Sequence, residues 1–194
     1  MNKKGGVDIN QIEIEPYCCD TLLSDGYYLS YRVKKDTLEK EFFKSLTLKK
    51  RNIEIKLLNE LNYKLPDHNL GFIMGDFGKS FIYVQSFGAG NPYYFQLIEK
   101  KSGKELKNGI LIDHNEEEQI LLYFDKNDKN RENILLYDFK KRKIRTIKEF
   151  ENSQCEYERI GGIRSCLEID TVTSSHVILK IETDKERISK SYSR

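Results

Sequence analysis

The sequence predicts an all-β, antiparallel domain. Short apolar runs recur along the chain and are separated by Gly, Asn, Asp and Lys, which is the pattern of strands and turns. With 194 residues, of which 38% are hydrophobic, the chain is long enough to bury a core. We therefore expect a single all-β domain over residues 1–194, in which residues 1–10 form a flexible N-terminal segment.

Seven runs have the clearest strand pattern. Several of them, such as "QILLYF", contain consecutive apolar residues, so both faces of each such strand must be covered. A simple sandwich with one solvated face would alternate strictly between apolar and polar residues. The runs cover residues 27–33, 53–58, 80–87, 93–98, 119–124, 133–139 and 176–182.

One segment, "DTLEKEFFKSL", has a helical pattern. Asp36 stands where an N-cap is expected, with Glu39 three residues later, and Phe42 and Leu46 fall on one face. We therefore expect at most one short helix, near residues 37–46. The alternation of Leu46 and Leu48 fits a strand instead, and this second interpretation stays open.

One short helix cannot cover both faces of so many strands, so other sheets must do so. The stretches "YYFQLIEKKSGKEL" and "ILLYDFKKRKIRTI" resemble the outer hairpins of β-propeller blades, in which a charged turn joins two strands. That resemblance implies a fold and no functional residues. Similar runs begin near residues 27, 81, 120 and 177. Four modules would form a small propeller-like domain; an irregular β-sandwich or barrel is the alternative.

The charge balance argues against a nucleic-acid partner. The chain has 33 Lys and Arg against 31 Asp and Glu, a net charge of +2, which provides no strong field for a polyanion. The densest basic run, residues 140–145, fits a solvated turn between two strands. No run approaches the ~18 apolar residues of a membrane span, so we expect no transmembrane segment.

The compartment is open between two alternatives. The opening "MNKKGGVDINQ" is cationic but lacks the apolar stretch of a secretory signal. The protein is then either cytoplasmic or, if a leader has been removed, a periplasmic or secreted lipoprotein.

Four cysteines bear on the compartment and on metal binding. Cys155 and Cys166 flank "EYERIGGIRS", and a hairpin turn at Gly161-Gly162 would bring them close together. We expect these two cysteines to be bridged if the protein is exported; four reduced, mostly buried thiols are the alternative. No Cys-x-x-Cys occurs and the three histidines are scattered, so the sequence predicts neither a metal site nor a cofactor.

Two stretches resemble ligand-binding motifs but lack essential residues. In "GDFGKS" (75–80) the first glycine of a phosphate-binding loop would have to be residue 73, which is Ile73, so we expect a hairpin turn. In "DKNDKNREN" (125–133) Lys129 and Asn130 stand where an EF-hand needs a ligand and a glycine. No ordered nucleophile motif occurs either, so no catalytic residue is predicted.

The stretch "FGAGNPYYFQ" (87–96) carries the predicted interaction residues. Its glycines predict a turn, and strand alternation puts Tyr93 with Phe95 on one face and Tyr94 with Gln96 on the other. These rings belong to the core or form an aromatic anchor at the tip of the loop. The interaction candidates are Phe87, Asn91, Tyr93 and Tyr94.

We expect a non-enzymatic module that binds another protein, such as an immunity or inhibitor protein or an envelope-associated adaptor. The absence of a catalytic motif and the Tyr-rich, mixed-charge composition favour this class. A small-ligand or glycan-binding β domain, or an enzyme with a dispersed site, is the alternative.

Overall fold

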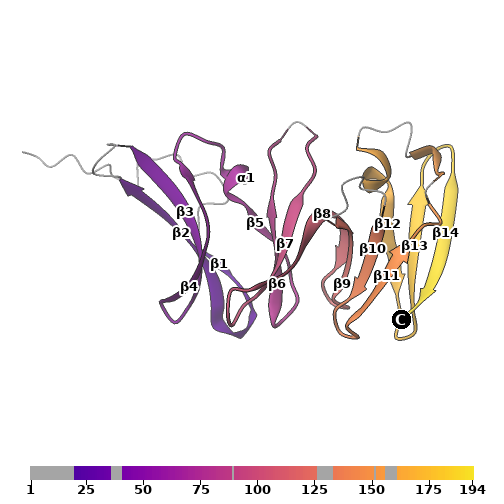
Figure 1. Ribbon diagram of the computed structural model, residues 1–194, viewed down its shortest axis with the longest axis horizontal. Helices are drawn as coiled ribbons and strands as arrows, with labels where there is room; N and C mark the ends of the chain where they lie inside the picture. The colour runs from indigo at the N-terminus through magenta and orange to yellow at the C-terminus, as the bar shows by residue number, and fades with distance from the viewer. Residues whose placement is uncertain (1–19, 36–40, 89, 126–132, 151, 156–160) are drawn as a thin grey trace, which may run out of the picture.

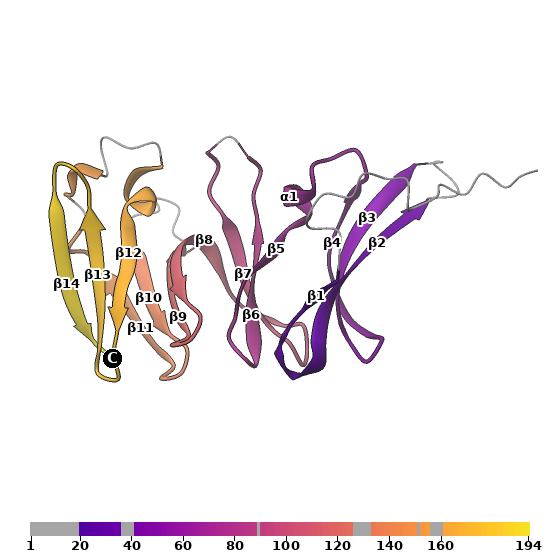
Figure 2. The ribbon, with the colours of Figure 1, turned by 180° about the vertical axis from the view of Figure 1, so that it is seen from behind.

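The chain folds into three antiparallel β-sheets that stack in a row (Figure 1). The computed structural model describes residues 20–35, 41–88, 90–125, 133–150, 152–155 and 161–194. From either side, the N-terminal strands lie at one end of the row and the C-terminal strands at the other (Figure 1 and Figure 2). The predicted all-β, antiparallel fold is confirmed; the segment expected to be flexible, residues 1–10, lies outside the described residues.

The first sheet has four strands in chain order, so each pairs with its neighbour in sequence. A short 3-10 helix, η2 (Ser24–Gly26), joins the first two strands, and the four-residue helix α1 (Asp67–Leu70) follows the last. The strands are β1 (Thr21–Leu22), β2 (Tyr27–Lys35), β3 (Phe42–Lys50) and β4 (Ile53–Asn62).

The helix predicted near residues 37–46 is wrong from Phe42 onward, because β3 begins there. Residues 36–40 of that prediction lie outside the described part of the chain. β3 pairs with β2 on one side and β4 on the other, and it buries Leu46 and Leu48 from one face. Backbone pairing with a strand on each side stabilises the extended conformation of this segment more than its local sequence favours a helix.

The second sheet has seven strands, again in chain order. They are β5 (Phe72–Asp76), β6 (Ser80–Gln85), β7 (Tyr94–Glu99), β8 (Glu105–Asn115), β9 (Ile120–Asp125), β10 (Ile134–Asp138) and β11 (Lys143–Ile147). The long strand β8 pairs with β7 through residues 105–110 and with β9 through residues 109–115. It crosses from one half of the sheet to the other (Figure 1), so the sheet folds over onto itself.

Gly109 allows the close approach at this crossing. It is paired with Phe95 of β7 and Asp125 of β9, so both ladders meet at this residue. A Cβ atom at Gly109 would lie 2.0 Å from the backbone oxygen of Phe124. Phe95 in turn packs edge-on against Tyr123, with 5.1 Å between ring centroids. A residue without a side chain is therefore needed where the two halves fold together.

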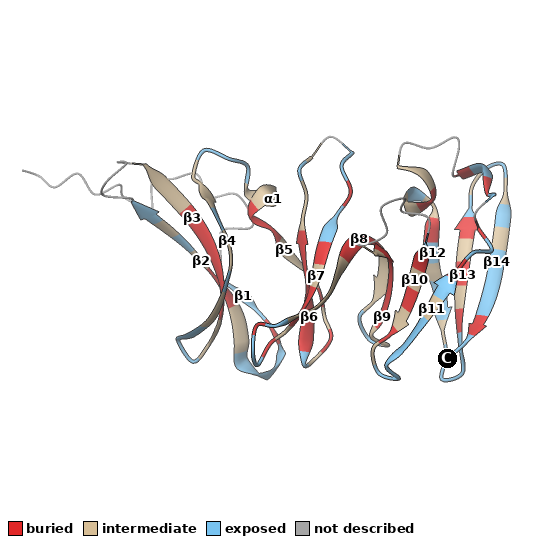
Figure 3. Ribbon diagram, viewed as in Figure 1, coloured by how far each residue is buried: buried red, intermediate tan, exposed pale blue. Residues whose placement is uncertain are grey.

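The third sheet completes the row and consists of β12 (Leu167–Val172), β13 (His176–Glu182) and β14 (Arg187–Ser193). The hairpin predicted at Gly161-Gly162 is wrong, because a 3-10 helix, η3 (Gly162–Ser165), follows Gly161 and β12 starts only at Leu167. Buried residues concentrate on the inner strands, whereas β11 and β14 are largely exposed (Figure 3).

Three apolar cores thus separate four layers: the first sheet, the two halves of the second, and the third sheet. In β6, Phe81 and Tyr83 pack into the core shared with the first sheet, whereas Ile82 and Val84 pack into the core between the two halves. The expectation that consecutive apolar residues need cover on both faces is confirmed for this strand.

The same is true of β9. Leu121 and Tyr123 face the first half of the second sheet, and Ile120 and Leu122 pack with the third sheet. The four modules predicted to begin near residues 27, 81, 120 and 177 correspond to β2, β6, β9 and β13, one in each layer. The layers do not close into a propeller ring, because the first and fourth lie at opposite ends of the described chain (Figure 1).

An ion pair of the second layer, between Lys100 and Asp76, holds Ser24 of the first layer through hydrogen bonds. Lys100, whose side chain is 1% exposed, places its Nζ 2.6 Å from Asp76 Oδ1 and 2.7 Å from Ser24 Oγ. Burial on its own raises the pKa of the Asp76 carboxyl, but hydrogen bonds from Lys100, Ser24 and Gly78 outweigh it, so the pKa lies below its ordinary value. The carboxylate is therefore stabilised in its charged form.

A disulfide joins two positions in the segment that precedes the third sheet. The structure joins Cys155 and Cys166, whose Cα atoms are 6.4 Å apart. Cys155 is buried in the core between the third and fourth layers, and its Sγ lies 3.6 Å from the Gly162 oxygen. The bridge therefore holds η3 against this core; Cys18 and Cys19 lie outside the described residues.

We expect Asp76→Asn to lower the free energy of unfolding by about 3–5 kcal/mol near neutral pH, because the buried Lys100 ammonium loses its counter-charge. With a lowered folded-state pKa, Asp76 stabilises the protein above its unfolded pKa and loses this effect as the pH falls through the folded one. The gap between variant and wild type should therefore narrow toward about pH 2. Chemical denaturation of both proteins at a series of pH values measures this difference in the free energy of unfolding.

Asp20→Asn is the matched control, since Asp20 pairs with Arg32 at an exposed position, and it should cost less than about 1 kcal/mol. A gap between Asp76→Asn and wild type that stays constant down to about pH 2 would contradict the role assigned to the carboxylate.

Replacing both Cys155 and Cys166 by Ala should lower the free energy of unfolding by about 2–3 kcal/mol, the loop-entropy value for a bridge of this separation. A reductant should destabilise the wild type and leave the double variant unchanged. Urea denaturation with and without reductant measures both effects. Mass spectrometry of the unreduced wild type should find the linked peptide; free thiols at both positions would reject the bridge.

Candidate functional site

The turn between β6 and β7 forms the candidate site, and we call residues 86–94 the aromatic turn. Gly88 and Gly90 have φ of 72° and 77°, a region that glycine occupies without strain. The Asn91 N–H donates to the Gly88 oxygen at 2.9 Å, and Pro92 is buried. The turn predicted from the glycines is therefore formed, with β7 starting at Tyr94.

The aromatic turn exposes three large rings. Phe87 is 54% exposed, Tyr93 44% and Tyr94 39%, whereas the next aromatic, Phe95, is buried. Phe87 and Tyr94 pack edge to face with 6.1 Å between their centroids. Tyr93 packs in the same manner, at 6.1 Å, against Phe72 of β5. Mutual packing fixes the orientation of these rings, and a large part of each stays open to solvent.

A small cavity of about 250 Å³ lies beside the Phe87 and Tyr94 rings. Its polar lining comes from three amide side chains: Gln85 of β6, Gln96 of β7 and Asn108 of β8. Gln96 and Asn108 are directly paired across the ladder, and Gln85 is paired with Tyr94. Amides both donate and accept hydrogen bonds, so this pocket suits a neutral polar ligand group beside an aromatic wall.

Two contacts from elsewhere in the chain hold the aromatic turn. Arg164 of η3 donates from Nη2 to the Gly90 oxygen at 2.7 Å, a link between the fourth layer and the second. At the base of the turn, the Ser86 N–H donates to the oxygen of His68 in α1 at 3.3 Å. The turn is thus anchored on both sides. The disulfide at Cys166, two residues beyond Arg164, holds the segment that carries this arginine.

The structure brings most of the predicted interaction residues together. Phe87 and Tyr94 form one exposed pair, Tyr93, directly before β7, packs instead against Phe72, and Asn91 is exposed in the turn itself. The predicted alternation placed Gln96 on the face of Tyr94, and both residues line the pocket. The sequence around Asn108 and Arg164 did not indicate that they belong to this site, because β8 and η3 reach the aromatic turn only in the folded chain.

Two other motifs form turns, as predicted, whereas residues 126–132 of "DKNDKNREN" lie outside the described part of the chain. "GDFGKS" closes the β5–β6 hairpin, in which Asp76 pairs with Phe81 and the Phe77 N–H donates to the Ser80 oxygen at 2.8 Å. The basic run at 140–145 spans the β10–β11 hairpin, in which Asp138 pairs with Lys143. Within the described residues, no three His, Cys, Asp or Glu side chains gather so as to hold a metal ion.

No protein-family model, curated protein or solved structure matches this chain. In the part of the chain that the structure describes, no helix is long and apolar enough to cross a membrane.

Phe87→Ala and Tyr94→Ala should each lower the free energy of unfolding by less than about 1 kcal/mol, because much of each ring is already exposed. Phe95→Ala, on the same strand as Tyr94 but buried, should cost about 3–5 kcal/mol and serves as the contrast. Thermal and urea denaturation of the three variants test this. If Phe87→Ala costs as much as Phe95→Ala, the exposed rings are structural.

Proposed function

We propose that this chain is a non-enzymatic binding module that holds a protein partner through the aromatic turn. The supporting observation is the pair of exposed rings, Phe87 and Tyr94, packed against each other on a turn anchored at Gly90 and Ser86. Large aromatic side chains with a fixed orientation lose little entropy on binding and bury much area, so they dominate protein interfaces.

The chemistry of the neighbouring pocket supports a binding role over a catalytic one. Its described lining consists of amides, aromatic rings and the backbone of Gly109. General acid–base or nucleophilic catalysis would need a carboxylate, imidazole, thiol or activated hydroxyl at this position. An immunity or inhibitor protein, which blocks its target by contact alone, and an envelope-associated adaptor both fit this mode of action.

The amide-lined pocket favours one second candidate, a glycan or small-ligand site. Gln85, Gln96 and Asn108 place three amide groups next to the Tyr94 ring, an arrangement that suits a hydroxyl-rich ring stacked on an aromatic side chain. Gln85 Nε2 also donates to the Asn69 oxygen at 3.3 Å and Asn108 Nδ2 to Glu105, so the amide oxygens and Gln96 are the groups open to such a ligand. Thermal-shift screens separate the two candidates. A glycan that raises the melting temperature of the wild type, but not that of Gln96→Ala, would favour the second.

For the protein-binding function, Phe87→Ala and Tyr94→Ala should each weaken the complex by more than about 1 kcal/mol, roughly fivefold in Kd. The partner is first isolated with the wild-type chain from cells that naturally produce it, and each variant is then titrated against the purified partner by calorimetry.

Ile144→Ala is the matched control, since Ile144 is 46% exposed on β11, outside the aromatic turn, and should leave Kd unchanged. Wild-type affinity for both aromatic variants, or an equal loss in Ile144→Ala, would show that the aromatic turn is not the interface.

A further inference from the structure

A second cavity, of about 570 Å³, opens at the other end of β6 from the aromatic turn. We call it the basal groove; it lies between the β5–β6 turn of the second layer and the β10–β11 turn of the third. Phe77, Lys79 and Ser80 line it from one turn, and Phe139, Lys140 and Arg142 from the other. A molecule bound here would contact both layers at once.

Three aromatic rings line the basal groove. Phe77 is buried, and its ring centroid lies 6.1 Å from that of Phe139. Phe139 lies 5.9 Å from Tyr137, edge to face, and both of these rings are half-buried. Burial raises the pKa of the Tyr137 phenol, although the nearby Arg142 acts in the opposite direction. The rings therefore offer a continuous, uncharged aromatic surface for a planar group.

The polar lining is cationic. Lys79, Lys140 and Arg142 carry positive charge, and Glu99 is the one carboxylate among the lining residues described. Lys79 and Arg142 have no ion pair with any described residue. Their charges are unneutralised at the mouth of a groove with apolar walls, where an anion is attracted more strongly than in open solvent.

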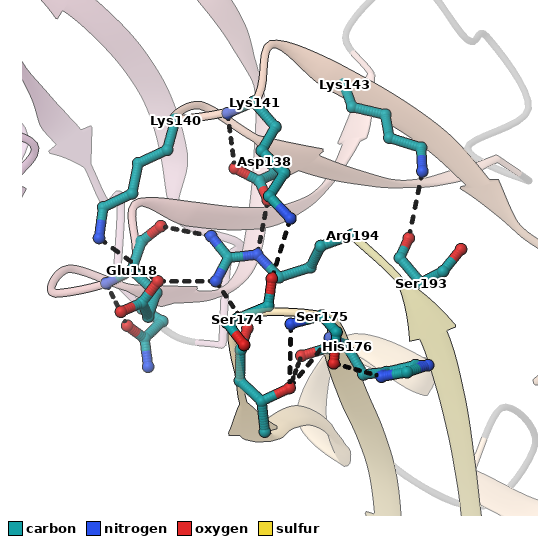
Figure 4. Close-up of polar contacts among 12 residues, drawn as sticks. Glu118, Asp138, Lys140, Lys141, Lys143, Ser174, Ser175, His176, Ser193 and Arg194 are labelled. Carbon is teal, nitrogen blue, oxygen red and sulfur yellow. Dashed lines mark hydrogen bonds and ion pairs between the residues drawn. The ribbon is translucent and has the colours of Figure 1, made fainter.

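Lys140 is held in place by a network that joins the third layer to Arg194 of the fourth (Figure 4). Its Nζ lies 3.3 Å from Glu118 Oε2, which also accepts a hydrogen bond from Arg194 Nη1 at 2.7 Å. Arg194, whose side chain is 3% exposed, also donates from Nε to Asp138 Oδ2 at 2.7 Å, directly before the β10–β11 turn. Hydrogen bonds from Arg194 and then Lys140 hold the pKa of Glu118 below its usual range. The network therefore fixes one side of the groove.

A buried hydroxyl in the groove lacks a partner. Ser80 is fully buried, and its Oγ makes no hydrogen bond with any described group. Buried polar side-chain atoms normally find a partner, so a bound molecule with a hydrogen-bond acceptor would satisfy this hydroxyl. Ser80 directly follows Lys79 in the chain. The Ser80 hydroxyl, which has no acceptor, and the unpaired Lys79 ammonium therefore lie at the same end of β6.

We propose that the basal groove binds a small planar organic anion, whose ring lies on Phe139 and Tyr137 and whose acidic group lies between Lys79 and Arg142. The groove volume falls in the range of small-molecule sites. The two unpaired cations, Lys79 and Arg142, match a single sulfonate, carboxylate or phosphate rather than the row of phosphates on a nucleic acid.

The test uses naphthalenesulfonate, which combines a planar ring with one acidic group, and the neutral naphthalenesulfonamide as its matched control. Calorimetric titration of the whole chain should show the sulfonate binding about tenfold more tightly than the sulfonamide. Its affinity should fall as salt is added, because the contribution of the exposed cations is screened. Equal binding of the two compounds, or no binding of the sulfonate, would overturn the proposal.

Variants then locate the site. Lys79→Gln and Arg142→Gln should each weaken sulfonate binding about fivefold and leave the melting temperature unchanged, since both side chains are exposed. Lys34→Gln, at an exposed position on β2, is the charge control, and Phe87→Ala separates this site from the aromatic turn; both should bind the sulfonate as wild type does. If Lys34→Gln loses as much affinity as Arg142→Gln, the sulfonate binds by overall charge and the site is wrong.

Discussion

The two inner strands β6 and β9 bury both of their faces. The need to cover both faces determines where the other layers lie. Each of these strands carries apolar side chains at consecutive positions, so a layer is needed on either side. Helices do not provide it, because α1 and the 3-10 turns described are only three or four residues long. Sheets stacked face to face satisfy both strands at once, and the first and third sheets each bury one inner face against the second.

Much of this fold could be predicted from local patterns. The seven predicted strands all occur, because continuous apolar runs and turn residues are local signals. β3 was predicted only as the alternative to a helix, because Phe42 and Leu46 also fit a helical face, and only pairing with β2 and β4 decides between the two. The open stack could not be predicted either. Whether the modules close into a ring depends on the angles between layers, and long-range packing rather than any short stretch of sequence sets those angles.

The two binding surfaces differ in how far the sequence could reveal them. The aromatic turn is a continuous stretch, so Phe87 and Tyr94 could be named in advance, although their exposure could not. The basal groove combines two turns that are far apart in the chain. Lys79 and Arg142 each belong to a motif with a simpler interpretation as a hairpin turn, and only the fold of the second sheet brings them to one cavity. No short stretch of sequence indicates that two distant turns will meet at one cavity.

Strand β8 also has a consequence for how the molecule opens. Because one part of β8 is paired with β7 and the other with β9, backbone hydrogen bonds tie this strand to both inner layers. No ladder joins the described parts of the first or third sheet to the second, so these outer layers depend on side-chain packing and a few polar contacts. We therefore expect the inner pair to behave as one cooperative folding unit, with its amide hydrogens exchanging last, while each end of the row opens as a separate subglobal unit.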